Sequence, residues 1–350
     1  MLATCPTDPI AAVVHDDPYP YYARLARHTP FTYNADLRCW IAASAAAAEA
    51  VLTSEACRVR PADEPVPFAI VGTRAGDAFR RFARMNDGSA HGPLRACATT
   101  LLAAFDPKIV DVTARRIGGE LLARVPAPDV NAYAEQLPAL TIADLLGIRE
   151  PLRRNVPAWT RTLVRSVAPG ATRDDAAAAD AAALALRDAL DSRGTDDDED
   201  ARCAEIGLLF QTYDATAGAI GNTLRALRDA TEAPSLDDAL ARTFRYDPPV
   251  QNTRRFASEA TTIGDSRVRP GDKILVVLAA ANRDPTARAS LSFGAGPHRC
   301  PGEDAAVTIA RAGIATLLDH GLDPATLGPV RYRPSANVRV AQFGGAQWSR

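Results

Sequence analysis

One cysteine of this 350-residue chain lies in a segment whose residue types could do chemistry. The segment runs from Phe293 to Gly302 and reads FGAGPHRCPG, with Cys300 near its end. Its glycines allow the backbone to pass close to a flat cofactor. Cys300 lies directly before a predicted helix, whose N-terminal dipole and unpaired N–H groups stabilise a thiolate. The segment therefore predicts a cysteine thiolate that faces a bound group.

A thiolate in this setting is a strong axial donor to heme iron and favours cleavage of the O–O bond. Phe293 would cover the sulfur side, and His298 and Arg299 would meet a heme propionate. The alternative is a glycine-rich turn with a structural cysteine before a helix, which is the usual explanation of a lone cysteine. The full pattern F-x-x-G-x-H-x-C-x-G is specific enough to favour heme.

This pattern resembles the heme-binding segment of the cytochrome P450 family, and the resemblance extends over almost the whole chain. Residues 91–95, HGPLR, resemble the H-x-x-x-R helix start that binds one propionate, and residues 244–251, FRYDPPVQ, resemble the helix end and strand that lead to an arginine on the other. Residues 276–285, VVLAAANRDP, are similar to the family's L-x-x-A-N-R-D-P run. The resemblance implies heme b (iron protoporphyrin IX), ligated by Cys300, with these residues around it: His91, Arg95, Arg255, Phe293, His298 and Gly302.

Taken singly, such basic residues more often form surface ion pairs. Taken together, several cations that converge on one dianionic cofactor would balance its charge.

Residues 211–218, QTYDATAG, resemble the family's long central helix, where an acid followed by an alcohol delivers protons for oxygen activation. Asp214 fits the acid, but Ala215 stands where the alcohol is usual, and Thr216 follows one residue later. One residue is about 100° of helical rotation, so Thr216 would substitute only after a local distortion of the helix. Otherwise water or substrate supplies the hydroxyl, or both residues are simply polar positions on a mixed face.

Three other departures from the family pattern stand out. Arg242 replaces the glutamate of the E-x-x-R pair that ends at Arg245, and Asp238 is a candidate acid to offset the two cations. The segment between Pro285 and Ser292 is short, so the loop that supplies the pair's third partner is missing. Pro301 has no N–H to donate to the sulfur, which would leave the thiolate more electron-donating and the iron potential lower.

The elements around these motifs predict a mainly α fold with a minor β region (α+β), as in the cytochrome P450 fold. We expect a short helix, strands and a second helix over residues 17–60, and an irregular connection over 61–90. Helices should fill about 91–230, with a solvated loop at 194–200 and a helix from the Ser235 cap to Tyr246. A small β region should occupy 255–282, followed by a final helix over 302–318. We interpret residues 1–350 as a single heme domain.

Composition excludes several classes of protein. The 40 Lys plus Arg residues nearly balance 42 Asp plus Glu, so nothing suggests nucleic acid or an anionic membrane as partner. No apolar run is long enough to span a membrane and no signal peptide is visible, so we expect a soluble, cytoplasmic protein. Six cysteines without C-x-x-C spacing argue against a zinc site and a disulfide framework.

The resemblance implies a monooxygenase that oxidises a small, mostly apolar molecule of secondary metabolism, with electrons from a ferredoxin and a ferredoxin reductase. Substrate contacts would come from Val66–Phe79, Tyr213–Ala217, Val250–Thr253 and Ser335–Val338. Two alternatives stay open. Without the usual alcohol, the heme protein would use peroxide or act as a dehydratase or isomerase; or it would bind heme or a partner protein without turnover.

Overall fold

A computed structural model describes residues 5–61, 63–124, 129–194, 198–232 and 234–348. The helices in this part of the chain are α1 Tyr19–His28, α2 Ala45–Thr53, α3 Arg74–Arg80, α4 His91–Ala103, α5 Pro107–Leu122, α6 Val130–Leu145, α7 Val156–Ser166, α8 Arg173–Asp191, α9 Glu199–Arg228, α10 Leu236–Tyr246, α11 Leu278–Ala281 and α12 Glu303–Asp319. The strands are β1 Phe31–Asn34, β2 Cys39–Ala42, β3 Cys57–Arg58, β4 Thr253–Ala257, β5 Thr261–Ile263, β6 Ser266–Val268, β7 Lys273–Val276, β8 Val330–Tyr332 and β9 Ala341–Phe343.

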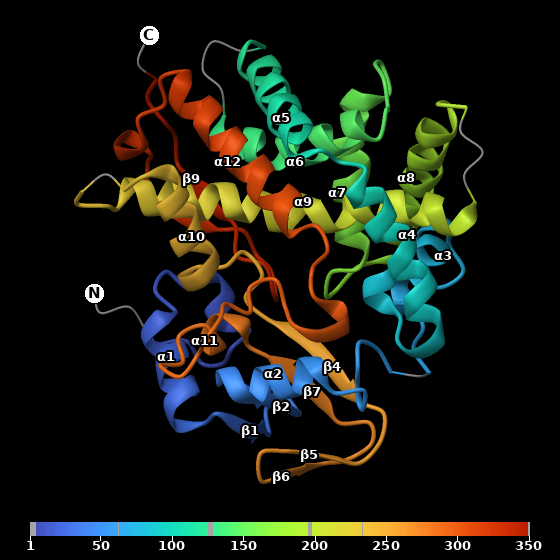
Figure 1. Cartoon of the computed structure of the whole chain (residues 1–350), viewed down its shortest axis with the longest axis vertical. Helices are drawn as coiled ribbons and strands as arrows, with labels where there is room; N and C mark the ends of the chain where they lie inside the picture. Colours follow the sequence, from blue (N-terminus) through green and yellow to red (C-terminus); the bar gives the residue numbers. More distant parts are fainter. Residues whose placement is uncertain (1–4, 62, 125–128, 195–197, 233, 349–350) are drawn as a thin grey trace.

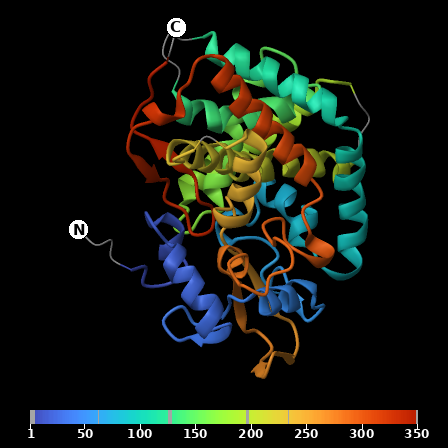
Figure 2. The same ribbon diagram turned by 60° about the vertical axis from the view of Figure 1, so that its left-hand side comes forward.

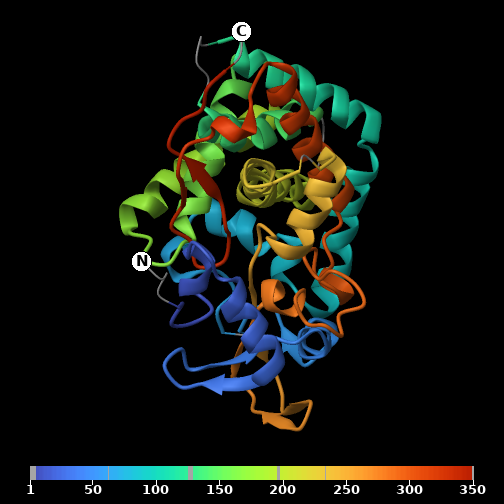
Figure 3. The same cartoon turned by 90° about the vertical axis from the view of Figure 1, so that its left-hand side faces the viewer.

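The long helix α9 crosses the middle of the molecule, with α5, α6 and α12 on one side and α1, α2, α11 and the strands β1, β2, β4 and β7 on the other (Figure 1). Its 30 residues begin after Asp198, whose side chain accepts a hydrogen bond from the N–H of Ala201. Acids in the first turn and arginines in the last turn complement the helix dipole. Seen nearly along its axis, α9 is surrounded by the other elements (Figure 3). Side chains on nearly every face of α9 therefore contact protein.

Glycines let other segments approach α9 closely. A Cβ atom at Gly218 would lie 2.7 Å from the carbonyl oxygen of Arg339, and one at Gly221 would lie 2.8 Å from that of Ala341. Because side chains there would force the backbones apart, the two glycines allow the C-terminal segment to lie directly on the helix.

Five of these strands build a sheet in the order β1-β2-β7-β4-β3, and the others form the pairs β5-β6 and β8-β9. Strands β2 and β7 are parallel, with Trp40 opposite Ile274, and the other pairs are antiparallel. Helix α2 packs on this sheet through Val51 and Leu52, which belong to the same apolar cluster as Ile274 and Val276. Figure 2 shows the sheet and the N-terminal helices together below the helical part.

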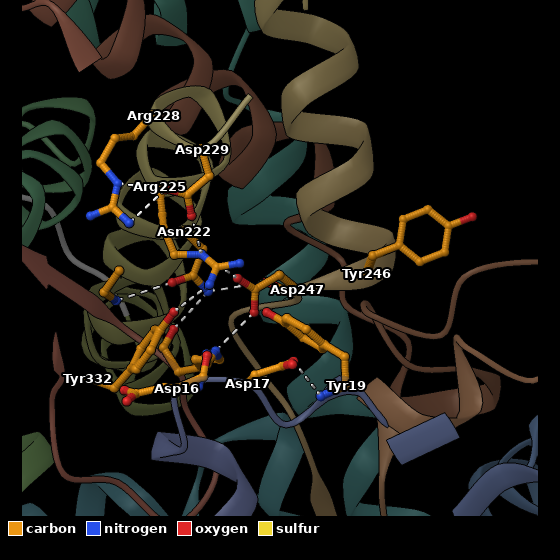
Figure 4. Close-up of polar contacts among 12 residues, drawn as sticks. Asp16, Asp17, Tyr19, Asn222, Arg225, Arg228, Asp229, Tyr246, Asp247 and Tyr332 are labelled. Atoms are coloured by element: carbon orange, nitrogen blue, oxygen red, sulfur yellow. Dashed lines mark hydrogen bonds and ion pairs between the residues drawn. The ribbon is translucent and has the colours of Figure 1, made fainter. Parts of the chain in front are cut away.

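A buried ionic cluster joins the two ends of the chain (Figure 4). The guanidinium of Arg339 is wholly buried, with Nε 3.1 Å from Oδ1 of Asp247, and it donates to the carbonyl oxygens of Val13 and His15. Its charge lies 3.4 Å from the ring centroid of Tyr332. Nε of Arg225 lies 3.8 Å from the other oxygen of Asp247. The cluster fixes the N-terminal segment, the end of α10 and the C-terminal segment together.

The order of the predicted elements is confirmed, including the Ser235 cap of α10 and the last helix. The prediction of a solvated loop over residues 194–200 is wrong at its C-terminal end, because Glu199 and Asp200 begin α9 and form ion pairs with Arg187 and Arg81. Residues 195–197 lie outside the described residues. In the part of the chain that the structure describes, no helix has the length and hydropathy to span a bilayer.

Candidate functional site

The segment before α12 holds Cys300 in a tight turn. The N–H of Cys300 donates to the carbonyl oxygen of Phe293 at 2.8 Å, which closes the loop between them. Gly294 and Gly296 adopt φ of +74° and +65°, and a Cβ at Gly296 would lie 2.9 Å from the carbonyl oxygen of Leu52. Backbone conformation therefore requires glycine at both positions, and the close approach of α2, which the sequence did not predict, requires it at Gly296.

The side chain of Cys300 is partly buried. Burial raises the pKa of Cys300, and a hydrogen bond from the N–H of Gly302 opposes that rise. Pro301 cannot donate, so Gly302 supplies the backbone N–H that reaches the sulfur. In the protein alone burial thus outweighs the expected stabilisation of the thiolate, whereas a coordinating metal deprotonates a thiol outright.

Two histidines meet beside this loop. The ring centroids of His91 and His298 lie 4.4 Å apart, although the residues are far apart in sequence. Nε2 of His298 lies 3.0 Å from Oδ1 of Asp87, whereas Nε2 of His91 and Nδ1 of His298 are buried with no hydrogen-bond partner. Burial, His298 and Arg95 lower the pKa of His91. Each ring therefore keeps one nitrogen without a protein partner, free to meet a ligand.

The acid beside these histidines stays ionised. Burial opposes the charge of Asp87, but hydrogen bonds from His298 and from the N–H of Val59 lower its pKa below the ordinary value. Asp87 thus orients His298, because it fixes one of the two ring nitrogens.

Two arginines interact electrostatically with this group of residues, Arg255 with Asp87 and Arg95 with Cys300. Arg255 in β4 is 5% exposed, and its Nη1 donates to the carbonyl oxygen of Arg254 at 2.9 Å. Burial lowers the pKa of Arg255 to about 10. Arg95 lies one turn after His91 on α4, and its charge lowers the pKa of Cys300. Among the described residues, no carboxylate lies within 4 Å of either guanidinium.

These residues fit heme. A buried guanidinium without a carboxylate and two buried ring nitrogens without partners are costly unless an anion meets them. Heme carries two propionates, and Cys300 supplies the thiolate that heme iron accepts. His91, Arg95, Arg255 and His298 would hold the propionates. Phe293 precedes Cys300 in the sequence, and Gly302 follows it.

Sequence reasoning missed two residues of this site. Asp87 lies four residues before His91, and an acid so close to a predicted propionate ligand could have been recognised in the sequence. Arg84 lies in a 3-10 turn, Ala83–Met85, and interacts electrostatically with Cys300, which opposes a lowering of the Arg84 pKa by the surrounding protein. Nothing in the sequence around Arg84 indicates this position, because only the fold brings it toward the cysteine loop.

The expected proton-delivery residues are arranged differently on α9. Asp214 is ion-paired with Arg333, with Nη2 2.5 Å from Oδ1, and Arg333 also lies 3.1 Å from Glu135. Thr216 is 1% exposed, and its hydroxyl has no hydrogen-bond partner. Gln211 is exposed, and Ala215, one turn later, is partly exposed. The open face of α9 thus presents Ala215, and Thr216 lies on a face packed against protein.

The suggested compensation at Arg242 is wrong. The carboxylate of Asp238 accepts a hydrogen bond from the hydroxyl of Ser235, and among the described residues it forms no ion pair with Arg242 within 4 Å. Arg242 and Asp238 are both exposed, so water solvates each charge. Arg245 lies 5.6 Å from the ring centroid of Tyr246, and its Nε is buried without a hydrogen-bond partner.

The segments expected to contact substrate come together around α9. Val250 forms a β-bridge with Val338, and the N–H of Gln251 donates to the carbonyl oxygen of Asn337 at 2.8 Å. On another side of α9, the rings of Phe79 and Phe210 lie 6.0 Å apart. The fold thus gathers these four segments, although their contacts with a substrate stay a prediction.

Comparisons with known proteins agree with this fold. The chain is 26% identical to "Cytochrome P450 monooxygenase PikC" of Streptomyces venezuelae, over 95% of this chain and 92% of that protein. It is 28% identical to "Cytochrome P-450 monooxygenase DoxA" of Streptomyces peucetius subsp. caesius, over 73% of this chain and 71% of that protein. No family model matches the chain.

Solved structures give the same result. The crystal structure of CalO2 covers 100% of this chain and 99% of its own, with a TM-score of 0.77 and 25% identity. That of P450BioI, in complex with a hexadec-9Z-enoic acid ligated acyl carrier protein, covers 93% and 97% with a TM-score of 0.77 and 22% identity. The chain has the cytochrome P450 fold. Together the relatives and the structures support its assignment to the cytochrome P450 family, whose proteins bind heme b.

Proposed function

We propose that this protein is a heme-thiolate monooxygenase that oxidises a small, mostly apolar molecule of secondary metabolism. The observation that carries the proposal is the convergence of Cys300 with the unpartnered ring nitrogens of His91 and His298 and with the buried guanidinium of Arg255, which meets no described carboxylate. A bound heme would supply the redox chemistry of oxygen activation. The named relatives are cytochrome P450 monooxygenases, which supports an enzyme over a non-catalytic heme binder.

The chain's own residues would hold and shield the reacting groups. His91, His298, Arg95 and Arg255 orient the cofactor through its carboxylates. Val250–Thr253 and Ser335–Val338, which are hydrogen-bonded to each other, would line the substrate side together with Tyr213–Ala217 and Val66–Phe79. Packed apolar walls exclude water from the reacting centre.

Electrons would come from a separate ferredoxin and its reductase. Arg299 follows His298 on the loop surface and is exposed, although it pairs with Glu303 at 2.5 Å. Such exposed arginines could meet an acidic ferredoxin, because opposite charges steer association.

The test is spectroscopic and then catalytic. Heme-loaded protein, reduced under carbon monoxide, should show the strongly red-shifted band of thiolate ligation, and Cys300→Ala should lose it. Turnover of a substrate panel with ferredoxin, reductase and NAD(P)H should then exceed turnover without them. Colourless protein after heme supply, or an unchanged spectrum in Cys300→Ala, refutes the proposal.

A second candidate function has its own support. The open face of α9 presents Ala215 instead of an alcohol, and Asp214 is engaged by Arg333. Proton delivery from this pair is thereby weakened, which favours a peroxide-driven oxidation or a dehydratase or isomerase reaction. Turnover with peroxide alone, or of substrate with no oxidant, at a rate above the reductase-driven rate would select this candidate.

A further inference from the structure

A hydrogen-bonded bridge joins the end of α10 to the loop that carries Cys300. The hydroxyl of Ser292 donates to the carbonyl oxygen of Phe244, in the last turn of α10. The same hydroxyl accepts from Nδ2 of Asn282 at 2.7 Å. Oδ1 of Asn282 accepts from the N–H of Leu291, also at 2.7 Å. Asn282 is 2% exposed, so both ends of its amide are used in the interior.

The bridge continues to the cysteine through Phe293. The Phe293 ring lies 4.9 Å from the ring of Phe244, centroid to centroid, and its carbonyl oxygen accepts from the N–H of Cys300. The residue directly after Ser292 therefore carries the carbonyl group that accepts from the N–H of Cys300. A shift of Ser292 away from α10 would move this carbonyl and with it the sulfur.

The position of this bridge matters because the ionic tie suggested by the resemblance is missing. Arg242 stands where the glutamate of E-x-x-R is expected, and no described carboxylate lies within 4 Å of Arg242 or Arg245. The connection from Asp284 to Ser292 is short and contains neither helix nor strand. The described hydrogen bond that ties it to α10 is the neutral one from Ser292, and the residue before this connection, Arg283, donates to the carbonyl oxygen of Tyr246.

We propose that Asn282 and Ser292 are positioning residues for Cys300, and that their neutral bridge takes the place of the missing Glu–Arg tie. The inference rests on the proposed function, since it assigns the bridge the task of holding the sulfur against heme iron. A buried hydrogen bond whose partner is removed leaves an unsatisfied polar group, so the bridge is costly to break. It contains no titrating group and should hold equally at low and high salt.

The experiment compares heme-loaded wild type with Ser292→Ala, Ser292→Thr and Ser290→Ala. Ser292→Ala removes the bridge and Ser292→Thr keeps the hydroxyl. Ser290→Ala is the control because it removes only the contacts of Ser292 with an exposed neighbour, at 3.0 Å, and leaves the bonds of Ser292 to Phe244 and Asn282 in place. We expect the thiolate-type carbon monoxide band to convert to the band of unligated or protonated sulfur roughly tenfold faster in Ser292→Ala. The reduction potential of the heme should shift in the same variant. Ser292→Thr should restore both readouts, and Ser290→Ala should leave both unchanged.

A second variant covers a failure to fold. If Ser292→Ala does not load heme, Asn282→Asp keeps the acceptor for Leu291 and removes the donor to Ser292, and it should show the same faster conversion. Wild-type-like conversion and potential in every heme-loaded variant overturn the inference while the proposed function stands. A wild type without the thiolate band overturns the proposed function itself.

Discussion

Replacing the buried arginine of β4 should stabilise the heme-free protein but weaken its binding of heme. Arg255 is 5% exposed, has no described carboxylate within 4 Å, and is charged at neutral pH. Replacing it with methionine, Arg255→Met, keeps much of its volume and removes the charge. We expect the heme-free protein to become more stable and heme to bind more weakly.

The magnitude follows from the pKa of Arg255. Burial lowers this pKa from 12.5 to about 10. A difference of about 2.5, at ~1.4 kcal/mol per pKa unit, corresponds to about 3 kcal/mol of penalty for the charged form. The variant also loses the hydrogen bond to the carbonyl oxygen of Arg254, about 1 kcal/mol. Net stabilisation of the heme-free fold is therefore about 2 kcal/mol, whereas loss of a charge-assisted bond to a propionate should weaken heme binding roughly 10- to 100-fold.

The assay is urea unfolding of heme-free protein together with heme titration. Arg254→Met is the matched control, because Arg254 is the exposed neighbour on the other face of β4, and it should change stability by less than about 0.5 kcal/mol. The pH dependence of the unfolding free energy tests the same charge independently. Between about pH 10 and pH 12 the unfolded chain keeps the Arg255 proton that the folded chain has lost, so wild-type stability should gain a component that rises with pH. Arg255→Met should lack it.

The reasoning would be refuted by a heme-free Arg255→Met protein that is less stable than wild type. Equal heme affinity in Arg255→Met and wild type would separately remove Arg255 from the propionate site.

Three further predictions concern the sulfur, the central helix and the ionic cluster. Pro301→Ala adds an N–H beside Cys300 and should raise the heme reduction potential; an unchanged or lower value in redox titration contradicts the role of this proline. Ala215→Thr restores an alcohol on the open face of α9 and should raise reductase-driven turnover per electron about tenfold, with little change in peroxide-driven turnover, as measured by product formed per NAD(P)H. Asp247→Asn should destabilise the fold by about 2 to 3 kcal/mol in urea, less than a fully buried pair because the Asp247 side chain keeps 12% exposure. The control Asp229→Asn, at a side chain 43% exposed, should change it by less than about 0.5 kcal/mol, and equal effects would argue against the cluster.

The sequence was sufficient where the chemistry is local in the chain. The turn from Phe293 to Cys300 is closed by a hydrogen bond between those two residues, and its glycines adopt backbone angles that their identity permits. Ser235 caps α10 through the N–H three residues later, which is also a local contact. Patterns of this kind can be recognised from spacing alone.

Contacts between distant segments could not be predicted in the same way. The contact between the rings of His91 and His298 and the pairing of Asp214 with Arg333 depend on how four separate elements pack. The resemblance indicated that both histidines meet a propionate, but it did not indicate that they touch. The resemblance also indicated Asp214 as a proton donor, but it did not indicate that Arg333 forms an ion pair with it.

Tethering of the chain's beginning to its end has a practical consequence for handling the protein. Three backbone acceptors of Arg339 belong to Val13, His15 and Asp16, so shortening the chain past these residues would strand a guanidinium in the interior. A purification tag fused ahead of residue 5 leaves those acceptors in place. Extension at the front should thus be tolerated, whereas trimming by sixteen residues should yield protein that aggregates or fails to accumulate.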